Sequence, residues 1–481
     1  MPWPKRVGDL PAIAWTAFQR CPVWPHPNPS SLCLCPLHPY SYCRDWIAVL
    51  RVIWTYKQAL KADDSKTDRD QIMANCHEQA AAILRQLFET NGGIYIKLGQ
   101  HLGLLDYIIP EQYVKAMQVF FDRAPTSSYE DVRRVVQEDL GADIETLFSS
   151  FDFAPLASAS LAQVHRAVLR DGREVAVKVQ HWGLREDSVG DIYTVAVLVE
   201  LTKRIFPDFN YTWLVEEIQK NLPRELNFVE EAANARRCAA MHADRHDVHI
   251  PEIVEDMTSS RVLTMEFCHG IPLTDVASIR AAKVDIAAIS RTVTEMFSEQ
   301  IFVHGRVHCD PHPGNVLVQA DGHGRARIVL LDHGLYRELP ETFRLEYCRL
   351  WRAIIEGDAA GIERHATTMN AGEYYPLFAA MLTYKPWDAV VGRGSDRLEL
   401  SGSAREKAEV RRNVGKYLRQ INALLARVPR DLLLLLKTND CLHGLENNLR
   451  AALERPSDLL PASRPIFNFA DVDDVIKVLR G

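Results

Sequence analysis

The chain has 481 residues, which predicts roughly two to four structural units rather than one small domain. It carries 63 acidic and 56 basic residues, for a net charge of −7, and 47% of its residues are hydrophobic. This balance is typical of a globular protein and gives no global electrostatic basis for nucleic-acid binding. No uninterrupted apolar run approaches the roughly 18–20 residues of a spanning helix, so membrane contact would be at the surface or through a segment outside this sequence.

The first 45 residues differ in composition from the rest. Residues 1–44 contain nine prolines and a single acid, Asp9. Because so many prolines prevent a regular helix or central strand, we predict an extended or disordered leader. The scarcity of acids resembles a mitochondrial transit segment, but such segments are amphipathic helices. Four cysteines also lie here, near His26 and His38, but without the paired CxxC spacing that is typical of a zinc knuckle.

A helical pattern follows up to about residue 150. Apolar residues recur at helical spacing through residues 77–103, interrupted at Asn91-Gly92-Gly93. The stretch SSYEDVRRVVQEDLGA then has a serine suited to capping a helix and Gly141 suited to ending it.

The periodicity changes at residues 151–180, which predict three consecutive strands. The small residues 157–160 join the first two, and residues 170–172 form a tight turn into the third. Alternation in residues 173–179 places three valines on one face of that strand and Lys178 on the other.

The remaining pattern is mixed and then mostly helical. A helical stretch reaches about residue 240, and two strand-like segments follow at 249–256 and 260–268. A helix is predicted from about 285 to 305, followed by two short strands around an Asp321-Gly322 turn. The sequence therefore predicts an α+β chain: helices, a small antiparallel sheet, and a largely helical lobe.

The nonapeptide VHCDPHPGN, residues 307–315, permits three interpretations. His308, Asp310 and His312 alternate and could hold a metal, although the two prolines bend the chain. Pro-Gly-Asn could simply form a β-turn. In a phosphotransferase, Asp310 would orient or deprotonate the attacking hydroxyl or water, and Asn315 would hold Mg²⁺.

The order of the neighbouring elements favours the third interpretation. A hairpin of small residues, the strand lysine Lys178, a helical glutamate, the HxDxxxxN loop and the DHG at 332–334 follow one another along the chain. Small residues admit phosphate close to the backbone, and lysine adds a positive charge. Together these are the parts of a protein-kinase-like fold, in the expected sequence.

The chain resembles the UbiB/aarF-domain family of atypical kinase-like proteins, and it is most similar to their mitochondrial members. The match spans roughly residues 75–450. It rests on a KxGQ motif at 97–100, an alanine-rich loop at 157–160 in place of a glycine-rich loop, Lys178 in VAVK, and DHG at 332–334. The resemblance implies five segments: a Pro/Cys-rich leader at 1–45, a helical extension carrying KxGQ at 46–150, a kinase-like N-lobe at 151–270, a helical C-lobe at 271–452, and a tail at 453–481.

The resemblance also implies roles for individual residues. The predicted site comprises catalytic Asp310 and Lys178; nucleotide-binding Ala157, Ser158, Ala159, Ser160, Lys178, Glu231, Glu266 and Cys268; Mg²⁺-binding Asn315 and Asp332; and regulatory Lys97, Gly99, Gln100 and Glu225. Glu231 is the predicted partner of Lys178, and Glu230 would point elsewhere because adjacent helical residues diverge by about 100°.

Asn227 departs from the pattern of the family. The family's ExD element falls at Glu225-Leu226-Asn227, so a partnership with Lys97 would depend on Glu225 alone. Two histidines have structural interpretations: we predict that His308 braces its loop through backbone hydrogen bonds and that His333 packs in place of an aromatic residue.

The leading hypothesis is a Mg²⁺-dependent protein that binds ATP or ADP, with kinase-like or ATPase activity toward a small molecule or lipid. The resemblance places it at a mitochondrial membrane, in lipid or quinone homeostasis, and identifies no protein partner. A protein substrate is disfavoured because no APE-like element or long activation segment follows Gly334. A pseudokinase scaffold, nucleotide-gated or nucleotide-free, is the alternative, and a zinc protein is a third, less favoured hypothesis.

Overall fold

A computed structural model provides the fold. It describes residues 38–61, 66–103, 109–122, 126–205, 212–320, 326–383, 385–392, 420–421, 423–425 and 427–453. Most of the predicted leader, the Asp321-Gly322 turn and nearly all of the predicted tail therefore lie outside the described residues. Within the described part of the chain, no helix combines the length and apolarity needed to cross a membrane.

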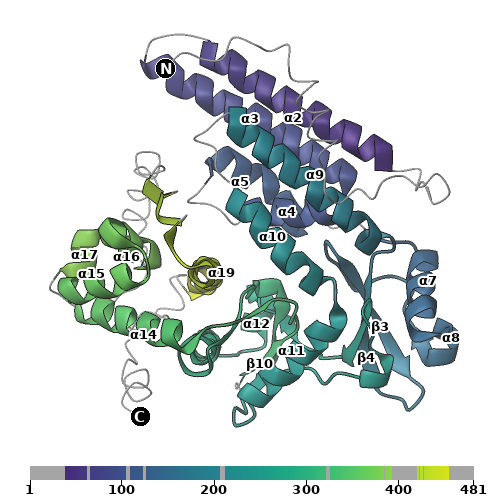
Figure 1. The fold of residues 1–481 in the computed structure, drawn as a ribbon. Helices are drawn as coiled ribbons and strands as arrows, with labels where there is room; N and C mark the ends of the chain where they lie inside the picture. The colour runs from purple at the N-terminus through teal and green to yellow at the C-terminus, as the bar shows by residue number, and fades with distance from the viewer. Residues whose placement is uncertain are drawn as a thin grey trace.

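Helices form most of the described structure (Figure 1). They are α2 (His38–Lys61), α3 (Lys66–Asn91), α4 (Gly93–Gly103), α5 (Glu111–Met117), α6 (Val119–Asp122), α7 (Tyr129–Leu140), α8 (Ile144–Leu147), α9 (Leu184–Ile205), α10 (Thr212–Glu225), α11 (Phe228–Met241), α12 (Val276–Ala281), α13 (Ile286–Ser298), α14 (Glu341–Glu356), α15 (Ala359–Thr368), α16 (Tyr375–Thr383), α17 (Trp387–Val391) and α19 (Arg430–Leu453). Shorter helical turns span Glu255–Met257, Glu299–His304, Pro313–Asn315 and Gly372–Tyr374.

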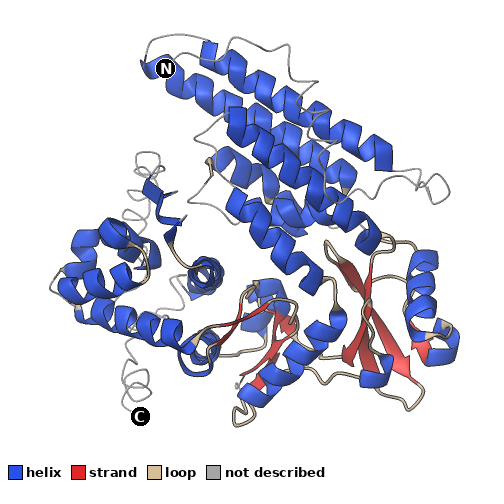
Figure 2. Cartoon of the chain, viewed as in Figure 1, coloured by secondary structure: helices blue, strands red, loops and turns tan. Residues whose placement is uncertain are grey.

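The strands, drawn in red in Figure 2, form two larger sheets and one two-stranded sheet. They are β1 (Phe148–Phe151), β2 (Ala157–Ser158), β3 (Ala162–Leu169), β4 (Glu174–Gln180), β5 (Val248–His249), β6 (Val262–Glu266), β7 (Ile271–Pro272), β8 (Arg306–His308), β9 (Val316–Ala320), β10 (Ala326–Leu330) and β11 (Tyr336–Glu338).

The helix α2 begins earlier than predicted. It starts at His38, inside the segment expected to be an extended leader, and Asp45 is fully buried. Pro39 does not prevent this start, because the first turn of a helix needs no backbone N–H donors from its own residues.

The helices α2 to α6 pack with α9 and α10 into one bundle (Figure 1). Its buried core joins Leu87 and Phe88 of α3 to Leu184 of α9 and Leu222 of α10. Residues 184–225, which were predicted as part of the N-lobe, therefore pack with the KxGQ helices although β3 and β4 precede them in the chain.

The first sheet has the order β1-β3-β4-β6, with β2 paired to β3, and these strand pairs are antiparallel. Gly172 (φ 91°) forms the turn from β3 to β4, as predicted. The three valines of β4 are buried against the valines of α7, which confirms the predicted alternation. The helix α7 thus packs on this sheet, although it was predicted within the helical extension. On the opposite face, Phe228 and Ala232 of α11 pack against Leu263 of β6.

The second sheet has the order β5-β10-β9-β7 and packs against α13. The prediction of a strand over residues 249–256 was wrong in extent. Only Val248–His249 is a strand, it pairs with β10 in parallel, and Glu255–Met257 is a helical turn. Pro251 explains the short strand, because proline has no N–H to extend the ladder.

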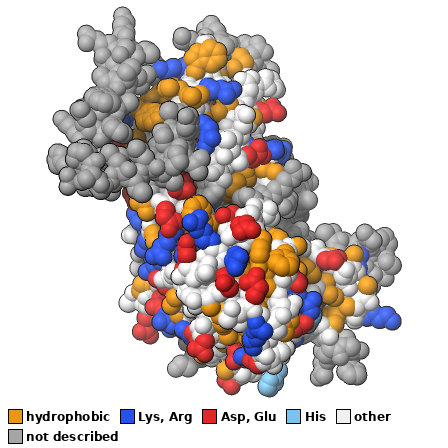
Figure 3. All heavy atoms as spheres, turned by 90° about the vertical axis from the view of Figure 1, so that its right-hand side faces the viewer, with side chains coloured by type: hydrophobic (Ala, Val, Ile, Leu, Met, Phe, Trp, Pro, Cys, Tyr) orange, Lys and Arg blue, Asp and Glu red, His pale blue; other side chains and the backbone are white. Residues whose placement is uncertain are grey.

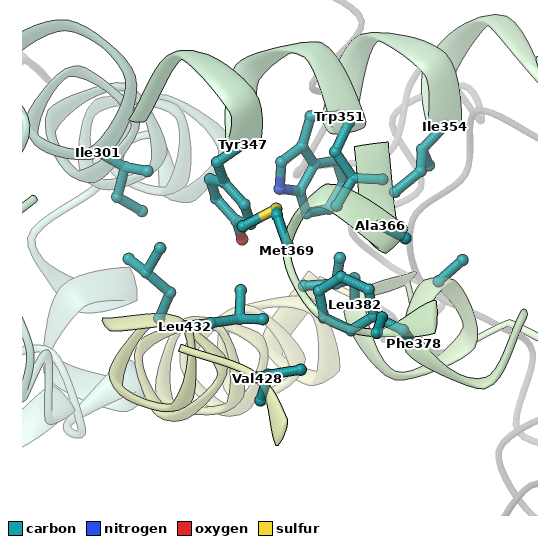
Figure 4. Close-up of a cluster of buried hydrophobic side chains, with 14 of the residues drawn as sticks. Ile301, Tyr347, Trp351, Ile354, Ala366, Met369, Phe378, Leu382, Val428 and Leu432 are labelled. Atoms are coloured by element: carbon teal, nitrogen blue, oxygen red, sulfur yellow. The ribbon is translucent and has the colours of Figure 1, made fainter. Parts of the chain in front are cut away.

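The C-terminal helices surround a third core (Figure 4). Tyr347 and Trp351 point from α14 toward Met369, and Leu432 of α19 lies on the other side of this cluster. The chain therefore has an α+β, two-lobed kinase-like fold with an added helical bundle. On the face seen in Figure 3, basic and acidic side chains intermingle, in keeping with the nearly balanced composition.

Candidate functional site

The candidate site is built around Lys178. Strand alternation turns Lys178 away from the valine core and toward α11, whose first turn carries Glu231. Lys178 Nζ lies 2.7 Å from Glu231 Oε1 and 3.0 Å from Asp332 Oδ2. The same ammonium lies 5.1 Å from the centre of the Phe228 ring. The structure thus brings together three predicted site residues, while Glu230 is exposed.

The charges of Lys178, Glu231 and Asp332 influence one another. Burial disfavours the Lys178 ammonium, but Asp332 and Glu231 outweigh burial, so the pKa of Lys178 is raised. Burial also disfavours the Asp332 carboxylate, yet Lys178 and the backbone N–H of Gly334 lower its pKa. For the more deeply buried Glu231, burial dominates and raises the pKa despite Lys178. One ammonium thus faces two carboxyl groups, and a bound cation would balance them.

His308 connects the catalytic loop to the DHG segment. Its Nε2 lies 2.6 Å from the carbonyl oxygen of Asp332, and its Nδ1 lies 3.1 Å from the backbone nitrogen of Asp310. A carbonyl can only accept and an amide N–H can only donate, so Nε2 carries the proton and Nδ1 accepts. His308 therefore braces the loop through backbone hydrogen bonds, as predicted, and both ring nitrogens are used.

His312 and Asn315 have local positions in the same loop. His312 Nδ1 accepts a hydrogen bond from Gly314 N (3.1 Å) and caps the Pro313–Asn315 turn. The Asn315 carbonyl accepts from Leu331 N (2.9 Å), so the predicted Mg²⁺ residue is adjacent to the chain that leads into Asp332. Among the residues that the structure describes, His308, Asp310 and His312 do not form a metal-binding group, and this disfavours the metal interpretation of the loop.

Two residues of the KxGQ motif, Lys97 and Gln100, contact neighbouring helices through their side chains. Lys97 Nζ lies 2.7 Å from Glu225 Oε2. Burial opposes the Lys97 charge, but Glu225, followed by Asp310 and Asp332, raises its pKa. Gln100 donates to the carbonyl of Phe120 (2.9 Å).

Gln100 also joins KxGQ to the alanine-rich loop, because Ser160 Oγ donates to Gln100 Oε1 at 3.3 Å. Within that loop, Ala157 and Ser158 form β2, and Ala159 N donates to the carbonyl of Ala162 (2.8 Å). Ser160 is buried. The predicted phosphate loop is thus a short hairpin held from one side by the helical bundle.

Three residues that were not predicted as site residues also brace this loop. His181 Nε2 lies 2.9 Å from the Ala159 carbonyl and its Nδ1 lies 2.7 Å from Ser127 Oγ. Gln163 Oε1 accepts from Ser127 N (2.7 Å). These three residues are far apart in sequence and form no motif, so only the fold reveals the network.

Two further predictions concern single positions. Glu266 ends β6 and β7 begins at Ile271, so residues 267–270, which include the predicted nucleotide-binding residue Cys268, connect the two sheets. Asn227 caps α11, accepting from Val229 N at 3.3 Å. A neutral residue at position 227 therefore has a structural role.

Comparisons with known proteins show which family the chain is similar to. The model of the ABC1 atypical kinase-like domain matches residues 119–366. Over 391 residues the chain is 47% identical to AarF domain-containing protein kinase 1 of Gallus gallus, covering 81% of this chain and 75% of that protein. It is 41% identical over 411 residues to AarF domain-containing kinase 1 of Drosophila melanogaster, covering 85% and 79%. Of solved structures, the Rv3197-erythromycin complex from Mycobacterium tuberculosis has a TM-score of 0.49 and 24% identity, covering 82% of this chain and 100% of that chain.

Proposed function

Because the chain belongs to the ABC1 atypical kinase-like family, we propose that it binds ATP with Mg²⁺ and transfers the terminal phosphate to water or to a small-molecule or lipid acceptor. The observation that carries this proposal is the position of Lys178 between Glu231 and Asp332, at 2.7 and 3.0 Å. A lysine fixed in this way is suited to bind nucleotide phosphates, as in protein kinases.

The donor set fits Mg²⁺. This ion prefers carboxylate and amide oxygens, which Asp332 and Asn315 supply. The two carboxyl groups beside a single ammonium also favour a cation. Bound there, Mg²⁺ would neutralise phosphate charge.

The other residues of the chain have complementary roles in this proposal. Asp310, held by His308, would orient the attacking hydroxyl or water and accept its proton. The backbone of the alanine-rich loop would approach the phosphates, and residues 266–268 would contact the adenine through backbone groups. Lys178 would balance phosphate charge.

A small acceptor is favoured over a polypeptide. Only Tyr336–Glu338 and a short connection separate Gly334 from α14, which begins at Glu341. This leaves no long segment on which a peptide could dock. We extend the proposal to mitochondrial lipid or quinone homeostasis at a membrane surface, on the family resemblance alone; fractionation of cells that express the chain would test the location.

A nucleotide-gated scaffold is the second candidate. It is favoured by Lys97, which pairs with Glu225 and lies within electrostatic reach of Asp310 and Asp332. If Lys97 keeps this position with nucleotide bound, its positive charge would compete with Mg²⁺ and an acceptor for Asp310 and Asp332. Binding without turnover would then be the outcome.

The test is a thermal-shift titration of the full chain with Mg-ATP and Mg-ADP, each variant compared with its own ligand-free form. Ligand at about 100 times its dissociation constant should add roughly 2.7 kcal/mol to the free energy of unfolding. We expect the shift to require Mg²⁺ and to be lost in Asp332→Asn and Glu231→Gln. Glu230→Gln is the matched control, since Glu230 is exposed on the same helix.

Phosphate release then separates the two candidates. An ATPase or kinase should turn over ATP, and Asp310→Asn should bind nucleotide but lose turnover. A shift without turnover would favour the scaffold. If the wild-type chain shows no shift with either nucleotide, with and without membranes, the nucleotide proposal fails.

A further inference from the structure

A group of three side chains that can ligate a metal lies beside residues 267–270, which connect the two sheets. One ligand atom each from His249, Glu266 and Cys268 lies within 4.8 Å of the other two. Within the described ranges, it is the only such group of histidine, cysteine and acidic residues. Neither the kinase-like reaction nor the zinc interpretation of the nonapeptide involves these three side chains together.

The strands hold this group in place. His249 lies in β5, opposite Val329 of β10 in the second sheet. Glu266 ends β6 in the first sheet, and its backbone nitrogen donates to the Glu252 carbonyl (2.8 Å). Glu266 Oε2 also accepts from Glu252 N at 3.3 Å. The histidine and the carboxylate are thus fixed by separate sheets before any ligand binds.

The burial of the group suits a bound metal ion. Cys268 is buried, whereas the side chains of His249 and Glu266 are 20% and 42% exposed. Metal could therefore enter from the Glu266 side, and water could reach the fourth position there. His249 Nε2 and Glu266 Oε2 lie 2.8 Å apart, so they would separate slightly to admit an ion between them.

We propose that His249, Glu266 and Cys268 bind one Zn²⁺, with water as the fourth ligand. Imidazole nitrogen, thiolate sulfur and carboxylate oxygen are the three donor types that zinc takes in proteins, commonly in tetrahedral geometry. The thiolate disfavours Mg²⁺ and Ca²⁺, which bind oxygen ligands. On binding, the zinc–sulfur bond replaces the S–H bond of Cys268, and the proton goes to solvent.

Such a site would join the two sheets next to the segment that links them. Residues 267–270 run from β6 to β7, so an ion held by β5, Glu266 and Cys268 would restrict the relative movement of the sheets. The side chains bind the metal in this proposal, whereas the proposed adenine contacts use the backbone groups of residues 266–268. The zinc site therefore borders the proposed adenine site but uses different atoms.

The test is metal analysis of the full chain after purification with zinc and removal of loosely bound metal. We expect one equivalent of zinc in the wild type and at least tenfold weaker binding in Cys268→Ser and His249→Gln. Cobalt substitution should give a sulfur-to-cobalt charge-transfer band, which reports the thiolate ligand in the wild-type chain without reliance on variants.

Two controls locate the ion. His269→Gln changes a neighbouring histidine that is 71% exposed and pairs with Glu174, and it should keep the zinc. A Cys33→Ser/Cys35→Ser double variant should also keep it, which separates the site from the N-terminal cysteines. Asp332→Asn should lose nucleotide binding but not zinc, so failure of one proposal can be told from failure of the other.

Three results would overturn the zinc proposal. One is the absence of stoichiometric zinc from wild-type protein even after reconstitution. Another is zinc that is unaffected by Cys268→Ser and His249→Gln. The third is bound cobalt without a charge-transfer band from sulfur.

Discussion

Lys97 and Glu225 form a largely buried ion pair, with Nζ and Oε2 2.7 Å apart, that connects α4 to the end of α10. Their side chains are 16% and 7% exposed. The pair lies close enough to the site for Asp310 and Asp332 to affect the pKa of Lys97. The pair therefore fixes the KxGQ helix to α10, and its charge interacts with those of the predicted catalytic acids.

A double-mutant cycle should measure the interaction between Lys97 and Glu225. Because removing one partner leaves the other charge buried and unpaired, Glu225→Gln and Lys97→Met should each lower the free energy of unfolding by about 3 kcal/mol. The double variant should lose clearly less than the sum. Urea unfolding measures all three.

Arg85 and Glu89 provide the matched surface pair, with side chains 43% and 44% exposed. The same cycle there should give a coupling of about 0.5 kcal/mol or less. Additive effects at Lys97 and Glu225 would show that the buried pair contributes no more than its surface counterpart.

Gly99 of the KxGQ motif lies in direct contact with Phe120. A Cβ added at Gly99 would come within 2.4 Å of the Phe120 ring, too close for a carbon contact. Gly99→Ala should therefore displace α4 from α6 and destabilise the chain by about 1–3 kcal/mol, which thermal unfolding would measure.

Gly444 in α19 is the control for Gly99. An added Cβ at Gly444 meets no heavy atom within 4 Å, so Gly444→Ala should be neutral or stabilising by up to about 1 kcal/mol, because alanine favours helix. If both alanine variants gained stability, the tight packing of Gly99 would be refuted.

Asn227 should be replaceable by aspartate but not by alanine. Asn227→Ala removes the acceptor for Val229 N and should cost about 1 kcal/mol, whereas aspartate retains an acceptor at the start of α11. Chemical unfolding of both variants measures the difference. Equal losses in the two would mean that the cap contributes little.

The family resemblance implied the pairing of Lys178 with Glu231, and two local periodicities explain why the structure has it. Strand alternation selects the face of Lys178, and the helical turn separates buried Glu231 from exposed Glu230. Where the partners are distant and no period relates them, as in the contact of Ser160 with Gln100, the sequence carried no signal.

Packing between units was harder to predict than the elements themselves. The sequence predicted helices over much of residues 184–240, but α9 and α10 join α2 to α6, because Leu184 and Leu222 are buried with Phe88. His249 was predicted within a long strand, yet Pro251 limits β5 to two residues in the second sheet. The position of this short strand in the second sheet places His249 beside Glu266 and Cys268.

Asp191 of α9 should make the bundle sensitive to pH. Burial, followed by repulsion from Asp187 and Asp45, raises the pKa of Asp191 to about 7. Asp45 is itself fully buried and accepts hydrogen bonds from Tyr95 (2.8 Å) and Asn91 (2.7 Å). Two acids are thus held near each other between α2 and α9.

The sign of the effect follows from the protons bound in each state. An unfolded aspartate has a pKa of about 3.9, so between about pH 4 and 7 the folded chain holds more protons at Asp191 than the unfolded chain. The contribution of Asp191 to stability therefore falls as pH rises through this window and is fully unfavourable above it. Asparagine does not titrate and avoids this loss.

Asp191→Asn should consequently be more stable than the wild type at pH 8, by about 2 kcal/mol once partial solvent exposure is allowed for. The advantage should shrink steadily toward pH 4.5. Melting temperatures of both proteins across pH 4.5–8 measure this difference, in which titrating groups that do not interact with Asp191 cancel. Glu186→Gln, an exposed change on the same helix, should differ from the wild type by a small and nearly constant amount. A difference for Asp191→Asn that does not change with pH would rule out a raised pKa as its cause.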